Sequence, residues 1–211
     1  MTLIFYGAPM STATLTELVL EELAIPHERV TIDLTKGDTK KPEFLKLNPN
    51  GKVPVLVHDG TVIFESAAIA MYLGETFGVE KKLYPAAGPL RGEAMKWIVW
   101  TNVSLGDAVG RYTRNTMDWY PKEQHNAAAG AAGMADILEH LGILDKHLAD
   151  RAYVLGADYS LADAHLNSFV DWLRHMKLDL AAFPHLVAWG TRCCERPAYK
   201  KLWAAAAPTH A

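Results

Sequence analysis

The hydrophobic pattern of this chain changes once, near Gly78, and that change limits the folds open to it. Before Gly78, short apolar runs alternate with one-sided helical patterns, in the order βαβ and then ββα. The predicted strands are residues 3–6, 30–32, 53–57 and 62–64, and the predicted helices are residues 15–23, 42–47 and a segment beginning at Ser66. After Gly78 almost every segment has the helical period. The pattern predicts a mixed α/β domain followed by an all-α domain.

The predicted domain limits follow from the same change. Residues 1–78 form the first domain, residues 79–89 a linker rich in Pro, Gly and Ala, and residues 90–211 the helical domain. Helices are expected over residues 91–117, 123–147 and 161–176, with a final pair between 183 and 206. Ser160 and Asp163 have the spacing of a capping box at the start of one of these helices, and this structural role is favoured over catalysis.

Composition excludes several classes of partner. The 211 residues carry 21 Lys and Arg against 24 Asp and Glu, a net charge of -3, and no basic run is interleaved with aromatics, so nucleic acid is not expected. The first residues lack a basic n-region, and no apolar stretch is expected to reach membrane-spanning length, which predicts a cytoplasmic protein. The nine His and two adjacent Cys residues have no metal-ligand spacing, so no metal is expected.

Three short segments lie where a predicted strand meets a turn or a helix start: YGAPMS at residues 6–11, KVP at 52–54 and FES at 64–66. Ser11 is placed to cap a helix, a role worth about 1 kcal/mol. Pro54 fits an edge strand, where a free backbone N–H and C=O on Val53 could pair with an extended peptide. Glu65 and Ser66 precede a helix, where N–H groups and a hydroxyl suit a carboxylate and Glu65 suits an ammonium group.

These segments resemble those of the cytosolic glutathione transferases, and the resemblance covers essentially the whole chain. Residues 6–11, 41–54 (KPEFLKLNPNGKVP) and 64–69 (FESAAI) are most similar to the serine-dependent classes, especially the phi class. Residues 153–163 (YVLGADYSLAD) resemble the second-domain signature, as in the bacterial beta class. The resemblance implies a thioredoxin-like first domain, glutathione as co-substrate and a homodimer.

The family's site residues can be carried over position by position. The resemblance implies that Ser11 donates a hydrogen bond to the glutathione sulfur, and that a cis Val53–Pro54 bond lets Val53 pair with the cysteinyl part. It implies that the γ-glutamyl end is held by Glu65 and Ser66. One hydroxyl and a helix N-terminus could together lower a thiol pKa of about 8.5 by roughly one to two units.

The chain departs from the closest pattern in two places. Lys40 and Lys52 are the expected partners of the glycyl carboxylate, but Thr39 stands where the phi class has His, and Lys52 where it has Gln. The beta class has a cysteine near position 11, whereas this chain has Met10, Ser11 and Thr12 there. Transfer of the thiolate to an electrophile is therefore favoured over thiol–disulfide exchange, and Thr12 is the alternative hydroxyl.

The acceptor site is expected beside Ser11. Met10, Asn102, Leu105 and Tyr112 are expected to line an acceptor pocket between the domains, while the tryptophans are expected mainly in the core. The predicted function is a detoxifying glutathione S-transferase that acts on small hydrophobic electrophiles. The alternatives are a non-catalytic carrier or interaction protein with this fold, or a specialised dehalogenase, etherase or isomerase.

Overall fold

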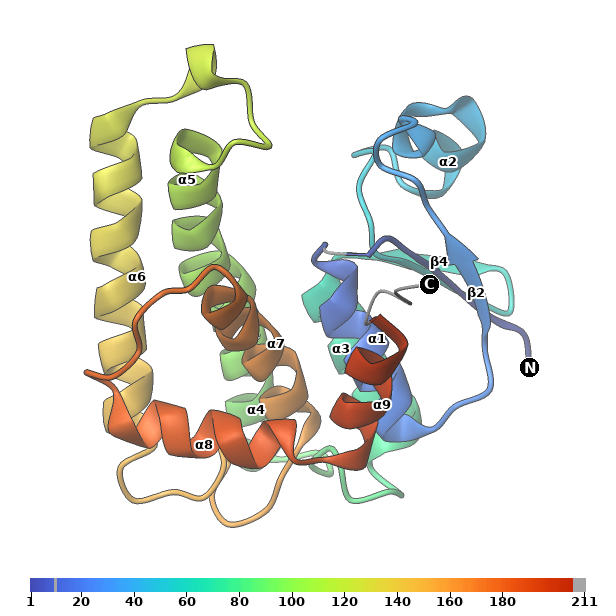
Figure 1. The fold of residues 1–211 in the computed structure, drawn as a ribbon. Coiled ribbons are helices and arrows are strands. Elements are labelled where there is room, and N and C mark those ends of the chain that lie inside the picture. The colour runs from blue at the N-terminus through green and yellow to red at the C-terminus, as the bar shows by residue number, and fades with distance from the viewer. Residues whose placement is uncertain (10, 207–211) are drawn as a thin grey trace.

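The computed structural model describes residues 1–9 and 11–206 and has a mixed four-stranded sheet in its N-terminal domain (Figure 1). The strand order is β2-β1-β3-β4, with β1 parallel to β2 and antiparallel to β3. The elements of this domain are β1 (Leu3–Gly7), α1 (Ala13–Leu23), β2 (Glu28–Thr31), η1 (Asp38–Lys40), α2 (Pro42–Leu47), β3 (Val55–His58), β4 (Thr61–Phe64), α3 (Ser66–Leu73) and η2 (Gly74–Gly78). The predicted thioredoxin-like α/β domain is confirmed.

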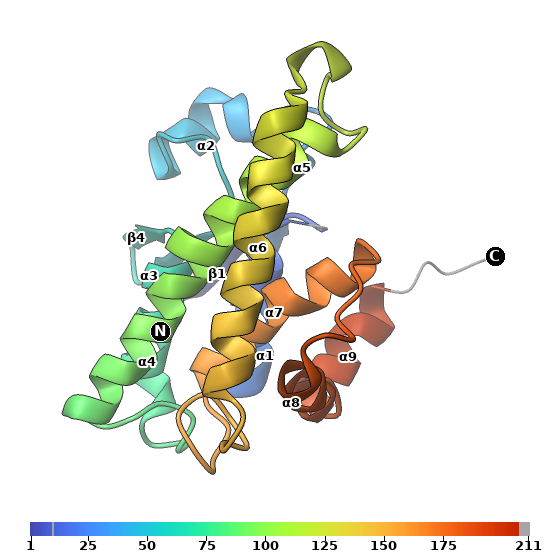
Figure 2. The same cartoon turned by 90° about the vertical axis from the view of Figure 1, so that its left-hand side faces the viewer.

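The remaining elements are helical, as predicted. They are α4 (Pro89–Trp100), η3 (Thr101–Leu105), α5 (Gly106–Thr116), η4 (Lys122–Gln124), α6 (Ala127–His147), α7 (Leu161–His175), α8 (Pro184–Cys194) and α9 (Pro197–Ala206). Figure 2 shows α6 running beside α5, and α7 lying behind them toward α1. The domain limits at residues 78 and 90 stay predictions.

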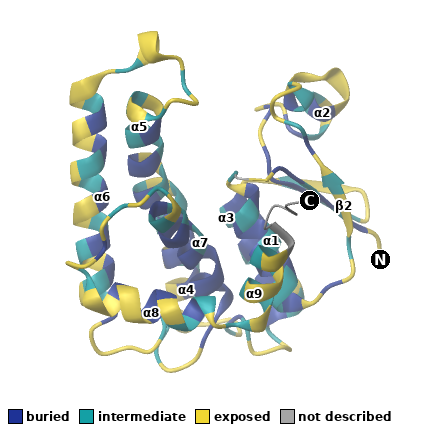
Figure 3. Cartoon of the chain, in the orientation of Figure 1, coloured by how far each residue is buried: buried dark blue, intermediate teal, exposed yellow. Residues whose placement is uncertain are grey.

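Packing between the two domains buries the inward faces of α1, α3 and α7 (Figure 3). Leu18 and Leu23 of α1 and Leu73 of α3 are almost completely buried, as are Leu166 and Val170 of α7. Side chains at positions three and four apart share a helix face, which is why the predicted apolar stripe of α1 becomes core. The domains therefore share an apolar contact surface.

The last helix returns to the first domain, where α9 packs against α1. Arg196, just before α9, donates two hydrogen bonds of 2.6 Å to the carboxylate of Glu22 in α1. The Glu22 side chain is only 3% exposed, and it also accepts a hydrogen bond from Tyr159 at 3.0 Å. The paired buried carboxylate links the two ends of the chain, which a local sequence pattern could not indicate.

The predicted capping box is confirmed. Asp163 Oδ2 accepts from the backbone N–H and the hydroxyl of Ser160, both at 2.9 Å, at the start of α7. Its other oxygen, Oδ1, accepts from the Val154 N–H at 2.7 Å and the Trp189 indole at 2.9 Å. The carboxylate thus holds the preceding loop and α8 as well as its own helix.

Three details differ from the sequence predictions. The strand β3 begins at Val55, because Pro54 has no N–H for the ladder, and the predicted helix over residues 91–117 contains the π-helical segment η3. The helix α6 is also, by length and composition alone, able to cross a membrane, contrary to the expectation above. It packs along α5, with Gly130 and Gly133 at the close approach, so helix packing accounts for part of its apolar surface.

Candidate functional site

The strand register gathers the three predicted segments at one end of the sheet. Tyr6 pairs with Val55, and Val55 pairs with Phe64. The turn after β1, the Val53–Pro54 dipeptide before β3 and Glu65 after β4 therefore lie at the same end. Because β1 is antiparallel to β3, the end of one strand meets the beginning of the other, and the hairpin brings β4 back to the same place.

Ser11 and Thr12 lie in the turn between β1 and α1, in the first segment. The Ser11 hydroxyl donates to the Ala8 carbonyl at 2.7 Å, and Ser11 Oγ accepts from the Ala13 N–H at 3.2 Å. The cap position of α1 is Thr12, one residue later than predicted, although Ser11 still satisfies one N–H of the first turn. The hydroxyl proton of Ser11 must leave Ala8 before it can serve a ligand.

The second segment contains a cis Val53–Pro54 bond, as the resemblance implied. The Val53 carbonyl accepts a long hydrogen bond of 3.3 Å from the Thr12 hydroxyl, which joins the first two segments. The Val53 N–H has no acceptor among residues 1–9 and 11–206. An N–H without an acceptor, together with a carbonyl that accepts only one long hydrogen bond, allows an extended peptide to pair with the backbone.

The third segment holds an exposed acid in an unusual backbone conformation. Glu65 has φ 72° and ψ 117°, a backbone conformation that residues other than glycine rarely adopt. Its carbonyl accepts the Ile69 N–H at 2.9 Å, and so begins the hydrogen bonding of α3. The next residue, Ser66, is buried and opens the helix, where the first N–H groups have no intrahelical acceptor.

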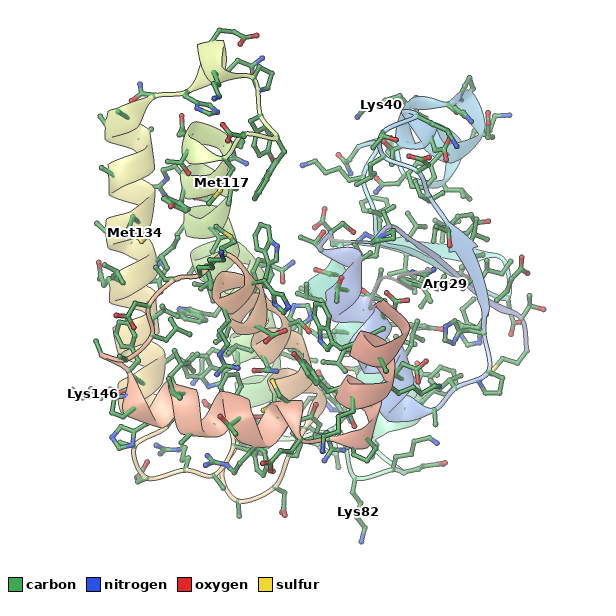
Figure 4. The ribbon with its side chains drawn as sticks, viewed as in Figure 1. Arg29, Lys40, Lys82, Met117, Met134 and Lys146 are labelled. Atoms are coloured by element: carbon green, nitrogen blue, oxygen red, sulfur yellow. The ribbon has the colours of Figure 1, made fainter. Side chains whose placement is uncertain are left out.

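Lys40 precedes α2, and Lys52 follows the turn after that helix. Lys40 Nζ donates to the Gly51 carbonyl at 3.2 Å, and Asn48 Nδ2 donates to the Lys52 carbonyl at 2.7 Å. Figure 4 shows Lys40 beside α2, on the sheet side of the molecule. Neither ammonium group is within 4.0 Å of a carboxylate in the described part of the chain, so both charges are available to an anion. Thr39, at the position of the phi-class His, is buried.

A cavity of about 550 Å³ opens beside Ser11, between the two domains. Its wall is mainly aromatic and hydroxylic, and no charged residue belongs to its described lining. The lining residues are Ser11, Thr12, Thr14, Leu15, Leu34, Thr113, Trp119, Tyr120, Ser168, Phe169, Trp172 and Trp203. A space of this size with an apolar wall suits a small organic molecule.

Three of the four residues predicted to line an acceptor pocket do not belong to the described lining of this cavity. Leu105 is completely buried in the core, Tyr112 packs with α6, and Asn102 is hydrogen-bonded to Ser66. Met10 lies outside the described residues. The assignment of residues to an acceptor pocket therefore stays a prediction.

The expectation that the tryptophans lie mainly in the core was right for Trp189, which is fully buried, but Trp119 and Trp172 line the cavity. Trp172 is four residues from Ser168 on α7, so both lie on one helix face, a spacing that could have been read from the sequence. Trp119 is 60% exposed in the loop after α5, and Trp203 comes from α9. Their approach to Ser11 depends on the tertiary structure.

Asn102 connects the third segment to the helical domain. Its Nδ2 donates to Ser66 Oγ at 2.8 Å, and its Oδ1 is 2.7 Å from His165 Nε2. His165, on α7, is completely buried, and that burial lowers its pKa to about 3, so the ring is neutral near neutral pH. No local sequence pattern marks this connection, because Asn102 lies 36 positions from Ser66 and 63 positions from His165.

The two cysteine thiols are not part of the described cavity lining. Cys193 and Cys194 are unpaired thiols at the end of α8, and burial raises the pKa of the Cys193 thiol, which keeps it protonated. Among the residues that the structure describes, no group of three or more His, Cys, Asp or Glu side chains is arranged to hold a metal ion.

Known proteins resemble the chain in sequence and fold. A model of the glutathione S-transferase N-terminal domain matches residues 1–75, and a model of the C-terminal domain matches residues 111–197. Glutathione S-transferase GstB of Escherichia coli is 32% identical over 88% of this chain and 89% of its own, and the disulfide-bond oxidoreductase YfcG of the same organism is 28% identical over 92% and 90%. A glutathione transferase of Phanerochaete chrysosporium, solved with oxidized glutathione, superposes with a TM-score of 0.88 at 27% identity, covering 97% and 94%.

Proposed function

Because the chain belongs to the glutathione S-transferase family, we propose that it conjugates the thiolate of glutathione to small hydrophobic electrophiles. The observation that carries this proposal is the gathering of Ser11, Val53 and Ser66 at one end of the sheet, beside a 550 Å³ cavity with an aromatic wall. The gathered residues suit a charged peptide, and the cavity beside them suits an apolar acceptor.

Each end of glutathione has a matching group. Glu65 is placed to bind the γ-glutamyl ammonium group, and Ser66 with the start of α3 its carboxylate. The cysteinyl backbone pairs with the free N–H and the carbonyl of Val53. The ammonium groups of Lys40 and Lys52, which have no carboxylate partner among the described residues, attract the glycyl carboxylate. No metal takes part in this proposal.

The chemical step needs a thiolate close to an acceptor carbon. The Ser11 hydroxyl turns from the Ala8 carbonyl to the sulfur, because a thiolate is a stronger acceptor than a neutral carbonyl. The sulfur then attacks the electrophilic carbon, a C–S bond forms, and the leaving group departs with the electron pair or the adduct takes up a proton. The cavity holds the acceptor against the sulfur and so lowers the entropic part of the barrier.

A second candidate is glutathione-dependent reduction of disulfides, which is supported by the likeness to YfcG. In that reaction the bound thiolate attacks a disulfide sulfur and releases one thiolate, and a second glutathione then attacks the mixed disulfide, releases the other thiolate and forms oxidized glutathione, so that no protein cysteine is needed. The absence of cysteine around Ser11 therefore does not oppose it.

We further propose a cytoplasmic homodimer. Val62 and Phe64 on the edge strand β4, and Val99 and Val103 on α4 and η3, are exposed apolar side chains, and β4 and α4 both pack against α3. Exposed apolar surface of this kind is typical of an interface between subunits.

The test is binding followed by turnover. Calorimetry should show binding of reduced glutathione, and a panel of aryl halides, epoxides, enones and a small disulfide should then identify the reaction. Conjugation of the carbon electrophiles supports the transferase, and turnover of the disulfide alone supports the second candidate. Binding without any turnover would indicate the carrier, and an absence of binding would refute all three.

A further inference from the structure

Ser66 can recognise an anion only if its hydroxyl proton is free. Its Oγ already accepts a hydrogen bond from Asn102 Nδ2, and no acceptor for its proton is present among the described residues. If the Asn102 amide were flipped, so that Oδ1 and Nδ2 exchanged places, Ser66 would donate its proton to Oδ1. The Ser66 oxygen would then offer a ligand only its lone pairs. The direction of one hydrogen bond thus decides whether Ser66 can bind a carboxylate.

His165 selects between these two directions. Its neutral ring carries one N–H, and Nδ1 is buried without a partner among the described residues. A buried N–H without an acceptor is less tolerable than a bare lone pair, so the proton belongs on Nε2. Nε2–H can donate only to the oxygen of Asn102, 2.7 Å away, and this turns the Nδ2 group toward Ser66.

We propose that Asn102 and His165 are positioning residues that fix the Ser66 hydroxyl as a donor to an anionic group, the γ-glutamyl carboxylate of glutathione. The proposal rests on the function proposed above. The hydrogen bonds run from His165 on α7 through Asn102 in η3 to Ser66 at the start of α3. The helical domain therefore determines whether Ser66, in the sheet domain, offers a ligand a donor or an acceptor.

The decisive variant is Asn102→Asp, because a carboxylate can only accept. It would accept from both His165 and Ser66, and the Ser66 proton would no longer face the ligand. Asn102→Ala is the matched control, since it leaves the Ser66 hydroxyl free to turn toward the ligand. Ser66→Ala measures the full contribution of the hydroxyl.

The probes are glutathione and γ-aminobutyryl-cysteinyl-glycine, which lacks only the glutamyl carboxylate. We expect Asn102→Asp and Ser66→Ala to raise the Kd for glutathione by about 10- to 100-fold and to leave the Kd for the analogue unchanged. Asn102→Ala should cause a clearly smaller loss. Equal losses for both ligands, or an equal loss in Asn102→Ala, would overturn the proposal.

A double variant separates the direction of the hydrogen bond from simple charge repulsion. In the Ser66→Ala background, Asn102→Asp should weaken glutathione binding no further, whereas repulsion by the new carboxylate would still weaken it and would contradict the proposal.

Nitrogen-15 NMR of the His165 ring tests the hydrogen-bond direction without any ligand. The expected form has hydrogen on Nε2, and hydrogen on Nδ1 would overturn the proposal. Failure of the wild-type protein to bind glutathione would instead refute the function proposed above, and the NMR result would still stand by itself.

Discussion

Replacing Ser11 by Ala tests the proposed activation of the thiol. The hydrogen bonds of Ser11 in the structure allow the stabilisation of the thiolate to be estimated. In the free protein the Ser11 hydroxyl donates to Ala8 at 2.7 Å. A hydrogen bond to a thiolate contributes about 1.5–3 kcal/mol, and the neutral bond that it replaces about 0.5–1.5 kcal/mol. The net gain is about 1 kcal/mol, which is smaller than the full strength of the charged bond.

This gain corresponds to a pKa difference of roughly 0.7 units at the bound thiol. The hydroxyl stabilises the thiolate, so Ser11→Ala should raise the thiol pKa by that amount. Well below this pKa the fraction of thiolate, and with it the rate, should fall about fivefold, and at pH values above the pKa the rate should recover. The affinity for glutathione should change little, because the ends of the peptide are held by other residues.

The assay is the ultraviolet absorbance of bound thiolate against pH, together with a pH–rate profile. Thr12→Val is the matched control, because it removes the neighbouring hydroxyl with little change in volume. The variant Ser11→Ala should also lose about 1 kcal/mol of stability, since the Ala13 N–H loses its acceptor. That loss alone would leave the thiol titration unmoved.

An unchanged titration midpoint in Ser11→Ala would refute the reasoning and reduce Ser11 to a helix-capping residue. A shifted midpoint in Thr12→Val, with none in Ser11→Ala, would assign the donor role to Thr12. This outcome is physically reasonable because the bond from Thr12 to the Val53 carbonyl is long, at 3.3 Å, and is easily exchanged.

Three further predictions concern binding, stability and assembly. Glu65→Ala and Glu65→Gly should both weaken glutathione binding in calorimetry, but only the glycine variant should gain stability, about 1 kcal/mol by denaturant unfolding, because it relieves the positive φ. Equal stabilities would contradict a strained backbone. Arg196→Leu should destabilise the protein by about 2–3 kcal/mol by leaving the Glu22 carboxylate buried and unpaired, and adding Glu22→Gln should recover part of the loss. Val103→Glu should convert a dimer to monomers in sedimentation, whereas a wild-type monomer at micromolar concentration would refute the dimer.

Much of the fold was predictable from the sequence because it depends on neighbouring residues. The strand and helix periods, the βαβ-ββα order and the Ser160–Asp163 capping box each arise within a few positions of the chain. The turns that contain Ser11 and Glu65 likewise depend on residues close to them in the sequence. Strand pairing then brings them together with little freedom, because Val55 pairs with both Tyr6 and Phe64.

Only the tertiary structure decided which side chains of the helical domain reach these turns. Asn102 was predicted to face an acceptor, but it binds Ser66, and its amide is held by His165 from a different helix. The cavity takes Trp119 from a loop and Trp203 from α9, which returns to α1 through Arg196. A hydrophobic period identifies the face of a helix that is buried, but it does not contain the crossing angles or the distances between helices that determine which partners meet.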